Sequence, residues 1–301
     1  MKKIAIYTAS IGGYDAVHQP AVVDERFDYI LFTDEVKDER VGAWQVRKVD
    51  YQSEDKTRVA RYVKTHPHTL LPDYEATLWL DASIEILTSF VYERCVELLE
   101  KGVQLASIKH PWRDCIYDEA YVVYGLEEER KIMDWCHQLR QEGYPRHKGL
   151  YESGVLFRRN DADVARLNED WWNVILHHTR RDQLALNYLL WKRDLLEGYV
   201  LPVGEHVANS TNVRINKHNN RARTAGRRGV KESFWEHARC RCRNGMEEKA
   251  EAFREFHYWL YGLNPVVAKV FLHLWGVYAT LVYGSIIKFR AYKRHKKQNN
   301  G

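Results

Sequence analysis

The sequence predicts an α/β fold in which a mainly parallel β-sheet is flanked by helices on both faces. From Lys3 to about Pro202, short runs of β-branched and aromatic residues alternate with longer segments of helical periodicity. Such alternation is typical of a parallel sheet covered by helices. The chain has 301 residues, of which 45% are hydrophobic, so it can fill a sizeable core.

The individual elements follow in order along the chain. The segments predicted to be strands read IAIYTA, DYILFTD, WQVRKV, ATLWLD, VQLASIK and ESGVLFR. Helices are predicted at roughly Glu54–Thr65, Phe90–Lys101, Leu126–Glu142, Asp161–His177 and Asp182–Leu195. We therefore expect one α/β domain over residues 1–205, a basic loop or linker over 206–245, and a C-terminal helical extension over 246–301.

Basic residues are concentrated in the last third of the chain. The segment Arg214–Arg243 contains ten Lys and Arg against two Glu, and Lys288–Lys297 contains six Lys and Arg without an acid, although the net charge of the chain is only +5. This distribution predicts an anionic surface as a partner. Nucleic acid is not expected, because the aromatic residues cluster in an apolar segment and do not interleave with the basic ones.

The segment Val266–Ile287 is almost wholly apolar or aromatic and directly precedes the basic tail. It approaches the length of a membrane span, but Lys269 and His273 argue against spanning. We expect a helix lying in the membrane interface, with the tail on anionic lipid. The alternative is a core or dimer helix with a solvated tail.

A cytoplasmic protein, peripheral on the inner face of the membrane, is expected. The N-terminal apolar run IAIY is far shorter than the apolar core of a signal peptide. The cysteines form no CxxC pair, so the sequence predicts neither a zinc site nor a disulfide framework, which favours a reducing compartment. They are Cys95, Cys115, Cys136, Cys240 and Cys242.

One carboxylate, Asp81, stands where the apolar run ATLWL stops, and open α/β sheets place their chemistry at such strand ends. In the preceding helix, Arg58, Arg61 and Lys64 are three residues apart and share one face. A row of cations beside a carboxylate suits a nucleotide diphosphate with a divalent metal. A solvated basic face is the other interpretation.

The turn after the first strand offers small side chains and backbone N–H groups that can approach a nucleotide closely. Its candidate contacts are Thr8, Ser10 and Gly12. The turn is neither a GxGxxG motif nor a P-loop. Asp34 follows the second strand, where it can accept hydrogen bonds from a base or ribose or cap the next segment.

Two further acidic residues begin elements in the second half of the domain. Glu152 enters a strand beside Ser153 and Gly154, which suggests a close approach by backbone or ligand. Asp182 and Gln183 open the segment QLALNYLLW. An N-cap role is expected for Asp182, and an N-cap at a helix mouth can also face a ligand.

Four segments together resemble a known family. RVARYVKTHPHTLLPDYEATLWLDASIEI, KHPWRDCIYDEA, ESGVLFRRN and RRDQLALNYLLW, in this order, resemble the TOD1/MUCI70-type glycosyltransferase-like family and, more distantly, the GT-A glycosyltransferases that use nucleotide-sugars. The resemblance covers roughly residues 1–205. It implies a GT-A-like, Rossmann-like fold with a nucleotide-binding half and an acceptor-binding half.

Matched to the family by position, Asp81 is the first acid of a DxD-like motif, and the helix carrying Arg58, Arg61 and Lys64 is the basic helix before it. The pair Asp182 and Gln183 resembles the Asp-Gln pair presented to the donor sugar. The strand that begins at Glu152 takes the place of the one lining the acceptor side.

The sequence departs from the family pattern at Ser83, where a second aspartate is typical. A single carboxylate with a hydroxyl two residues on is a poor pair for Mg²⁺ or Mn²⁺, which prefer several hard oxygen ligands. Three interpretations remain open: a metal held by Asp81, diphosphate oxygens and a late ligand such as His206; a metal-free site neutralised by the three helix cations; or a site without catalysis.

The resemblance implies a glycosyltransferase that moves a sugar from a nucleotide-diphosphate donor to a glycan or lipid-linked acceptor, in surface polysaccharide synthesis. Asp182 is the first candidate for the catalytic carboxylate and Glu152 the second. The alternative is a non-catalytic module that binds membrane or polysaccharide on a degenerate GT-A fold.

Overall fold

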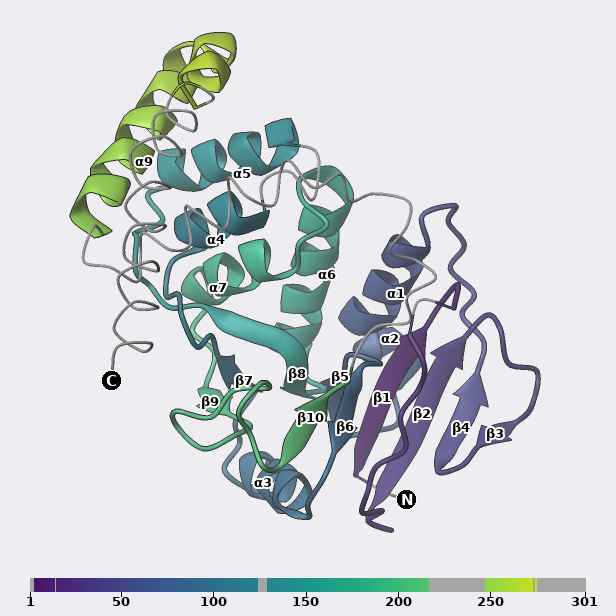
Figure 1. Cartoon of the computed structure of the whole chain (residues 1–301). Helices are drawn as coiled ribbons and strands as arrows, with labels where there is room; N and C mark the ends of the chain where they lie inside the picture. The colour runs from purple at the N-terminus through teal and green to yellow at the C-terminus, as the bar shows by residue number, and fades with distance from the viewer. Residues whose placement is uncertain (1–2, 14, 124–128, 217–246, 273, 275–301) are drawn as a thin grey trace, which may run out of the picture. The chain divides into compact units, whose positions relative to one another are not determined.

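The computed structural model describes residues 3–13, 15–123, 129–216, 247–272 and 274 (Figure 1). The chain divides into two compact units. The first comprises Met1–Glu119 and Tyr144–Ala225, and the second comprises Ala120–Gly143 and Gly226–Gly301.

An eight-stranded sheet forms the centre of the first unit, in the order β3-β4-β2-β1-β5-β8-β7-β9. Neighbours pair in parallel at β1–β2, β1–β5, β2–β4 and β7–β9, whereas β8 runs antiparallel to β5 and β7 and β3 runs antiparallel to β4. The mostly parallel sheet that the sequence predicts is thus confirmed. The antiparallel direction of β8 was not predicted. The strands are β1 (Ile4–Ser10), β2 (Phe27–Thr33), β3 (Arg40–Val41), β4 (Trp44–Arg47), β5 (Ala76–Leu80), β7 (Leu105–Lys109), β8 (Tyr151–Arg159) and β9 (Glu197–Tyr199).

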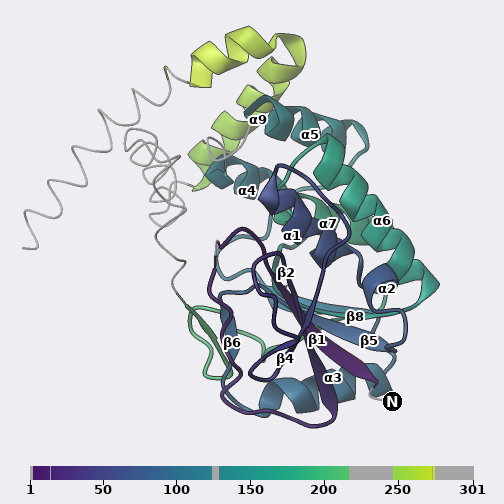
Figure 2. The same ribbon diagram turned by 90° about the vertical axis from the view of Figure 1, so that its right-hand side faces the viewer.

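Helices cover both faces of this sheet, as expected (Figures 1 and 2). On one face lie α1 (Lys56–Thr65), α2 (Pro67–Leu70), α6 (Ala162–His177) and α7 (Gln183–Trp191), and on the other lies α3 (Phe90–Glu100). All residues of β1 are buried, because successive side chains of a strand point to opposite faces and both faces are covered.

Side-chain alternation in the strands divides the interior between the two faces. Ile6 of β1 and Phe157 of β8 belong to the same hydrophobic cluster as Tyr92 of α3. Tyr7, the next residue in β1, points the opposite way, and its hydroxyl donates to the carbonyl of Lys64 in α1 at 2.9 Å. The odd-numbered and even-numbered positions of β1 therefore serve different layers.

The helix starts depend on capping aspartates. The Asp55 side chain accepts a hydrogen bond from the N–H of Thr57 at the start of α1, and Asp161 accepts two such bonds at the start of α6, as an N-cap should. Asp182 also directly precedes a helix, α7, but its side chain makes no capping bond. The predicted capping role of the Asp182 side chain is therefore wrong, because its carboxylate turns toward α1 instead.

A two-stranded antiparallel ribbon joins β6 (Ile84–Ile86) to β10 (Val213–Ile215). The N–H of Asn216 donates to the carbonyl of Ser83 at 2.7 Å, and Arg214 forms an ion pair with Glu85 at 2.8 Å. The described start of the predicted linker, up to residue 216, therefore lies against the segment that follows Asp81. Residues 217–246 of that linker lie outside the described residues.

The second unit contains α5 (Glu129–Gln141) and α9 (Glu247–Leu263), and α4 (Ile116–Val123) crosses the division in sequence. The hydroxyl of Tyr261 in α9 donates to Asp134 of α5 at 2.6 Å, and Arg140 of α5 lies over the ring of Tyr258. A further helix spans 265–272. None of the described helices is long and apolar enough to cross a membrane, and the predicted apolar segment from 275 onward, with the basic tail, lies outside the described residues.

Candidate functional site

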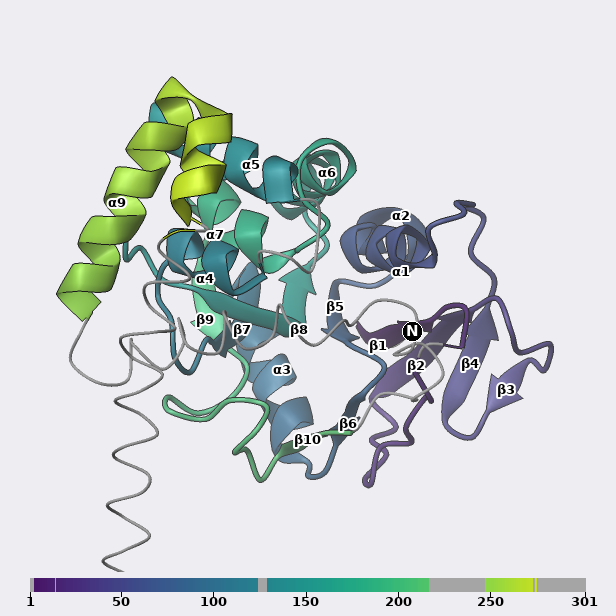
Figure 3. The same cartoon turned by 45° about the horizontal axis from the view of Figure 1, so that its top comes forward.

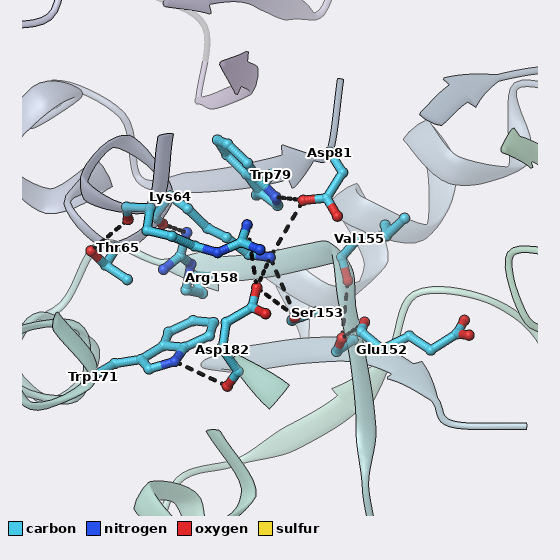
Figure 4. A network of polar contacts seen from close by, with 12 residues as sticks. Lys64, Thr65, Trp79, Asp81, Glu152, Ser153, Val155, Arg158, Trp171 and Asp182 are labelled. Atoms are coloured by element: carbon cyan, nitrogen blue, oxygen red, sulfur yellow. Dashed lines mark hydrogen bonds and ion pairs between the residues drawn. The ribbon is translucent and has the colours of Figure 1, made fainter. Parts of the chain in front are cut away.

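Charged and polar side chains from or beside four elements meet where β5 ends (Figure 4). Asp81 follows β5, Lys64 belongs to the last turn of α1, Ser153 belongs to β8, and Asp182 precedes α7. The carboxyl end of a parallel strand is where open α/β sheets bind ligands. We therefore take this group of four residues, the Lys64 cluster, as the centre of the candidate site.

Lys64 is the buried centre of the cluster, with 0% of its side chain exposed. Its Nζ lies 2.5 Å from Oδ2 of Asp182, 3.3 Å from Oγ of Ser153 and 3.4 Å from Oδ1 of Asp81. The rings of Trp79 and Trp171 lie within 6.0 Å of the ammonium, near enough for cation–π attraction. The lysine charge is thus neutralised inside the protein.

Asp182 is the buried carboxylate of the cluster. Its Oδ2 also accepts a hydrogen bond from Ser153 at 3.0 Å and lies 3.7 Å from the guanidinium of Arg61. Burial alone would raise the pKa of Asp182, but Arg61 and Lys64 outweigh burial and hold that pKa well below its usual range. Asp182 is consequently ionised and is a weak proton acceptor.

Asp81 is the accessible carboxylate, with 39% of its side chain exposed. Its Oδ1 accepts from the indole of Trp79 at 2.7 Å and from Lys64. In the described part of the chain, the side-chain hydrogen bonds of Asp81 all involve Oδ1. A Cβ at Gly154 would lie 3.2 Å from Oδ2, so the absence of a side chain there leaves room beside this oxygen.

A buried arginine, Arg158 of β8, fixes the backbone beneath Lys64. Its guanidinium donates to the carbonyl of Lys64 at 2.5 Å, to Oδ1 of Asn168 at 2.6 Å and to the hydroxyl of Tyr7. The carbonyls of the last helical turn lack intrahelical partners and carry partial negative charge. Arg158 and Tyr7 together therefore hold the end of α1 that positions the lysine.

The turn after β1 has the conformation that requires glycine. Gly12 and Gly13 have φ of 66° and 62°, a region that other residues rarely adopt. The N–H of Gly12 donates to Oδ1 of Asp34 at 2.9 Å, and Lys56 donates to Oδ2 at 2.8 Å. Burial would raise the pKa of Asp34, but the hydrogen bonds from Lys56 and Gly12 outweigh burial and lower this pKa. Asp34 thus anchors the turn to α1.

Thr8 and Ser10 are both buried in β1. The hydroxyl of Ser10 donates to the carbonyl of Asp15 at 2.8 Å, whereas Oγ1 of Thr8 has no hydrogen-bond partner among the described residues. Since β1 and β5 are parallel neighbours, this turn and Asp81 lie at the same edge of the sheet.

Glu152 lies beside Ser153 in sequence, but its side chain points away from the Lys64 cluster (Figure 4), because neighbouring strand residues face opposite sides. Its Oε2 accepts from the N–H of Val207 at 3.2 Å. Burial raises the pKa of Glu152, partly offset by this N–H and by the charges of His206 and Arg113. Glu152 is therefore the better proton acceptor of the two predicted catalytic carboxylates.

Aromatic and basic residues surround this second carboxylate. The ring of His206 lies 5.8 Å from that of Trp112, whose side chain is largely exposed. Arg113 donates to the buried Glu119 at 2.5 Å and to His110 at 3.1 Å. Burial, together with Arg113 and His206, lowers the pKa of His110 to about 3, so this histidine is neutral.

The remaining predicted site residues lie as follows. Arg58 is 3.9 Å from Asp55, at the opposite end of α1 from Lys64. Gln183 is the first residue of α7, and Ser83 is buried. No hydrogen bond, ion pair or ring contact among the described residues joins His206 to Asp81.

Among the residues that the structure describes, one group of three has metal-ligating atoms within 4.8 Å of one another: Cys115, Asp118 and His147. It contains neither Asp81 nor His206, and the cysteine spacing gave no sign of it. Asp118 already forms an ion pair with Arg146 at 2.9 Å, and Asp114 forms one with His147 at 2.7 Å.

Sequence reasoning did not identify three of the residues that contact Lys64. Trp79, Ser153 and Arg158 are brought to it by the sheet and its helices. The one available signal was Arg158, a charged residue that directly follows the apolar run VLF of the predicted strand.

Comparison with known protein families gives a match. The family model described as TOD1/MUCI70, glycosyltransferase-like domain, matches residues 1–200. That range includes α1, the sheet through β9 and every residue of the Lys64 cluster. No curated protein matches the chain.

Proposed function

The chain belongs to the TOD1/MUCI70 glycosyltransferase-like family, and we propose on this premise that it transfers a sugar from a nucleotide-diphosphate donor to a glycan or lipid-linked acceptor. We assign it a GT-A-like fold, a role in surface polysaccharide synthesis, and a cytoplasmic location on the inner face of a membrane. The observation that carries the proposal is the accessible carboxylate of Asp81 beside the buried pair of Lys64 and Asp182.

Asp81 is the proposed contact of the donor diphosphate. Mg²⁺ is usually bound by one or two carboxylates together with substrate phosphates, so Asp81 fits as a protein ligand through Oδ2, which its hydrogen bonds to Trp79 and Lys64 leave unused. A bound Mg²⁺ or Mn²⁺ would neutralise charge that develops on the leaving diphosphate. His206, which lies later in the sequence, remains a proposed second protein ligand of this metal.

Lys64 and Asp182 are assigned a positioning role. Because the carboxylate of Asp182 lies nearer the ammonium than Asp81 does, Asp182 holds Lys64 in place. The Asp81 contact is the one that a donor can replace without leaving a buried charge unpaired. This assignment moves Asp182 from proton transfer, our first expectation, to support of the cation.

Glu152 is the proposed base. Its pKa is raised and so lies nearer to neutral pH than that of an ordinary glutamate. A general base is most effective when its pKa is close to the pH at which the enzyme works. In the proposed reaction, the acceptor hydroxyl gives its proton to Glu152, its oxygen bonds the anomeric carbon, and the bond from that carbon to the diphosphate breaks. The turn at Gly12, with Thr8, Ser10 and Asp34, would lie toward the nucleotide.

Donor binding tests the proposal directly. Thermal unfolding is measured with UDP, GDP, CMP and dTDP compounds, with and without Mn²⁺, because a ligand that binds only the folded state raises its stability. Asp81→Asn is expected to abolish the shift given by the best nucleotide. The matched control is Asp73→Asn, which changes an exposed aspartate in the turn before β5 and should keep the shift.

The same variants are then compared in donor turnover. If no nucleotide in the panel stabilises the protein, and neither the wild type nor Asp81→Asn turns over any donor, the transferase proposal is wrong. The chain would then be a binding module on a degenerate fold.

A further inference from the structure

Large apolar side chains project from α9 into solvent. Phe256, Trp259 and Leu263 are exposed, with Trp259 at 57%. Their spacing of three and four residues places them on one stripe of the helix. The opposite side of α9 is inward-facing, since Tyr258 and Tyr261 are buried. An aromatic and aliphatic stripe facing water is costly unless something covers it.

The helix at 265–272 carries a second stripe. Val266 and Val270 are exposed, with Val266 at 72%, and Leu274, which is also helical, is exposed as well. They lie four residues apart, whereas Ala268 and Leu272 are buried. The exposed and buried sets therefore alternate as they do on an amphipathic helix.

The two stripes belong to one hairpin. The chain turns at Asn264, whose side chain accepts from the N–H groups of Val266 and Val267, and the helices run side by side in opposite directions (Figure 3). The rings of Phe256 and Phe271 lie 5.0 Å apart, joining the helices edge to face. We call the exposed residues the hairpin surface: Phe256, Trp259, Leu263, Val266, Val267, Val270 and Leu274.

The charge of the sequence around the hairpin surface indicates what covers it. From Phe256 to Gly301 there is no Asp or Glu, and there are seven Lys and Arg. A second copy of the chain would bring the same positive charge against it, and like charges oppose such an interface. An anionic lipid surface offers hydrocarbon for the apolar side chains and negative headgroups for the lysines and arginines.

We propose that the hairpin surface is a docking site for an anionic lipid bilayer, into whose interface its side chains insert without spanning it. Trp259 is placed for the boundary between headgroups and acyl chains, where tryptophan is enriched. Lys269, exposed on the same helix as Val266 and Val270, reaches the headgroups through its flexible stem. The inference specifies the membrane contact of the peripheral location proposed above and is independent of the transferase chemistry.

Vesicle flotation tests the inference with the full chain and without any donor, so its outcome cannot be confused with failure of the transferase proposal. The wild type is expected to float with vesicles of phosphatidylcholine and phosphatidylglycerol and to float poorly with phosphatidylcholine alone. High salt should weaken binding, because it screens the headgroup charge. Trp259→Glu combined with Val270→Glu should lower the partition coefficient at least about tenfold, since each change removes buried apolar area and adds repulsion.

The matched control is Leu196→Glu, which places the same charge at a side chain 54% exposed in the first unit and should float like the wild type. Circular dichroism and thermal unfolding establish that each variant is folded. Three results overturn the inference: a wild type that ignores anionic vesicles, a double variant that floats as well as the wild type, or a wild type that is dimeric and becomes monomeric in the variant without either binding lipid.

Discussion

Asp182→Asn is expected to destabilise the fold by about 3–5 kcal/mol, because it removes one partner of a buried ion pair. The ammonium of Lys64 is fully buried and lies 2.5 Å from the carboxylate that would be lost. The ion pair of Arg61 with the same oxygen, at 3.7 Å, would be lost as well. The remaining carboxylate, Asp81, lies farther from Lys64 and is partly exposed, so it cannot replace Asp182 fully.

Urea unfolding followed by circular dichroism near neutral pH measures the effect. Asp81→Asn is the comparison, and it should cost about 1 kcal/mol or less, the value typical of a partly exposed pair. If Asp182→Asn unfolds within about 1 kcal/mol of the wild type, Asp182 does not neutralise the buried lysine and the positioning role is refuted.

The pH dependence of the same pair provides a second measurement. The pKa of Asp182 is lowered in the folded state, whereas an unfolded aspartate titrates at about 3.9. The pair therefore contributes its full stabilisation above about pH 4 and loses it as the pH falls below that value. The difference in unfolding free energy between the wild type and Asp182→Asn should shrink in acid, and a difference that stays constant would contradict this account.

Three further predictions concern other parts of the first unit. Glu152→Gln should lower sugar transfer by about 100-fold or more without loss of stability, and should remove the acid limb of the wild-type pH–rate profile, because that limb reports ionisation of a carboxyl with a raised pKa; an unchanged profile would exclude Glu152 as the base. Tyr7→Phe should cost about 1.5–3 kcal/mol in urea unfolding, because it removes a hydrogen bond to the charged Arg158, and a neutral effect would mean that the end of α1 does not depend on it. His110→Asn, which keeps a side-chain acceptor, should reduce the loss of stability that occurs as the pH falls from about 6.5 to 3. In the wild type, the unfolded histidine binds a proton below about pH 6.5, whereas the folded histidine, whose pKa is about 3, does not. Unfolding is therefore favoured as the pH falls. Equal pH dependence in this variant and the wild type would place the acid sensitivity elsewhere.

Periodicity in the sequence was sufficient to predict the main elements of the sheet. The buried strands β1 and β5 are continuous apolar runs, and the predicted helices correspond to α1, α3, α5, α6 and α7. Short strands such as β3 and β6, with two and three residues, carry too little pattern to be recognised. The antiparallel direction of β8 is set by how the chain returns to the sheet, which side-chain alternation does not encode.

Residues of the candidate site could be predicted only where the neighbouring residues in the sequence mark their position, such as a strand end or a helix face. Asp81 stands at a strand end and Lys64 on a helix face, and both positions can be read from neighbouring residues. The contact between Lys64 and Asp182 joins residues 118 positions apart, so it depends on how α1 and α7 pack over the sheet. The helix-start pattern at Asp182 was misleading, because aspartate suits an N-cap and a buried ion pair equally well.

The unequal contacts of Lys64 also indicate which of them would change when a donor binds at the proposed site. A cation with one close buried carboxylate and one more distant, exposed carboxylate can exchange the second for another anion at little cost, whereas loss of the first strands a charge. The 2.5 Å contact to Asp182 should therefore persist when a diphosphate binds, and the 3.4 Å contact to Asp81 should be the one that changes. Because Asp81 already bonds Trp79 through Oδ1, it can release Lys64 and remain held. Under the proposed function, ligand exchange would therefore occur at Asp81 while the buried pair of Lys64 and Asp182 preserves the fold.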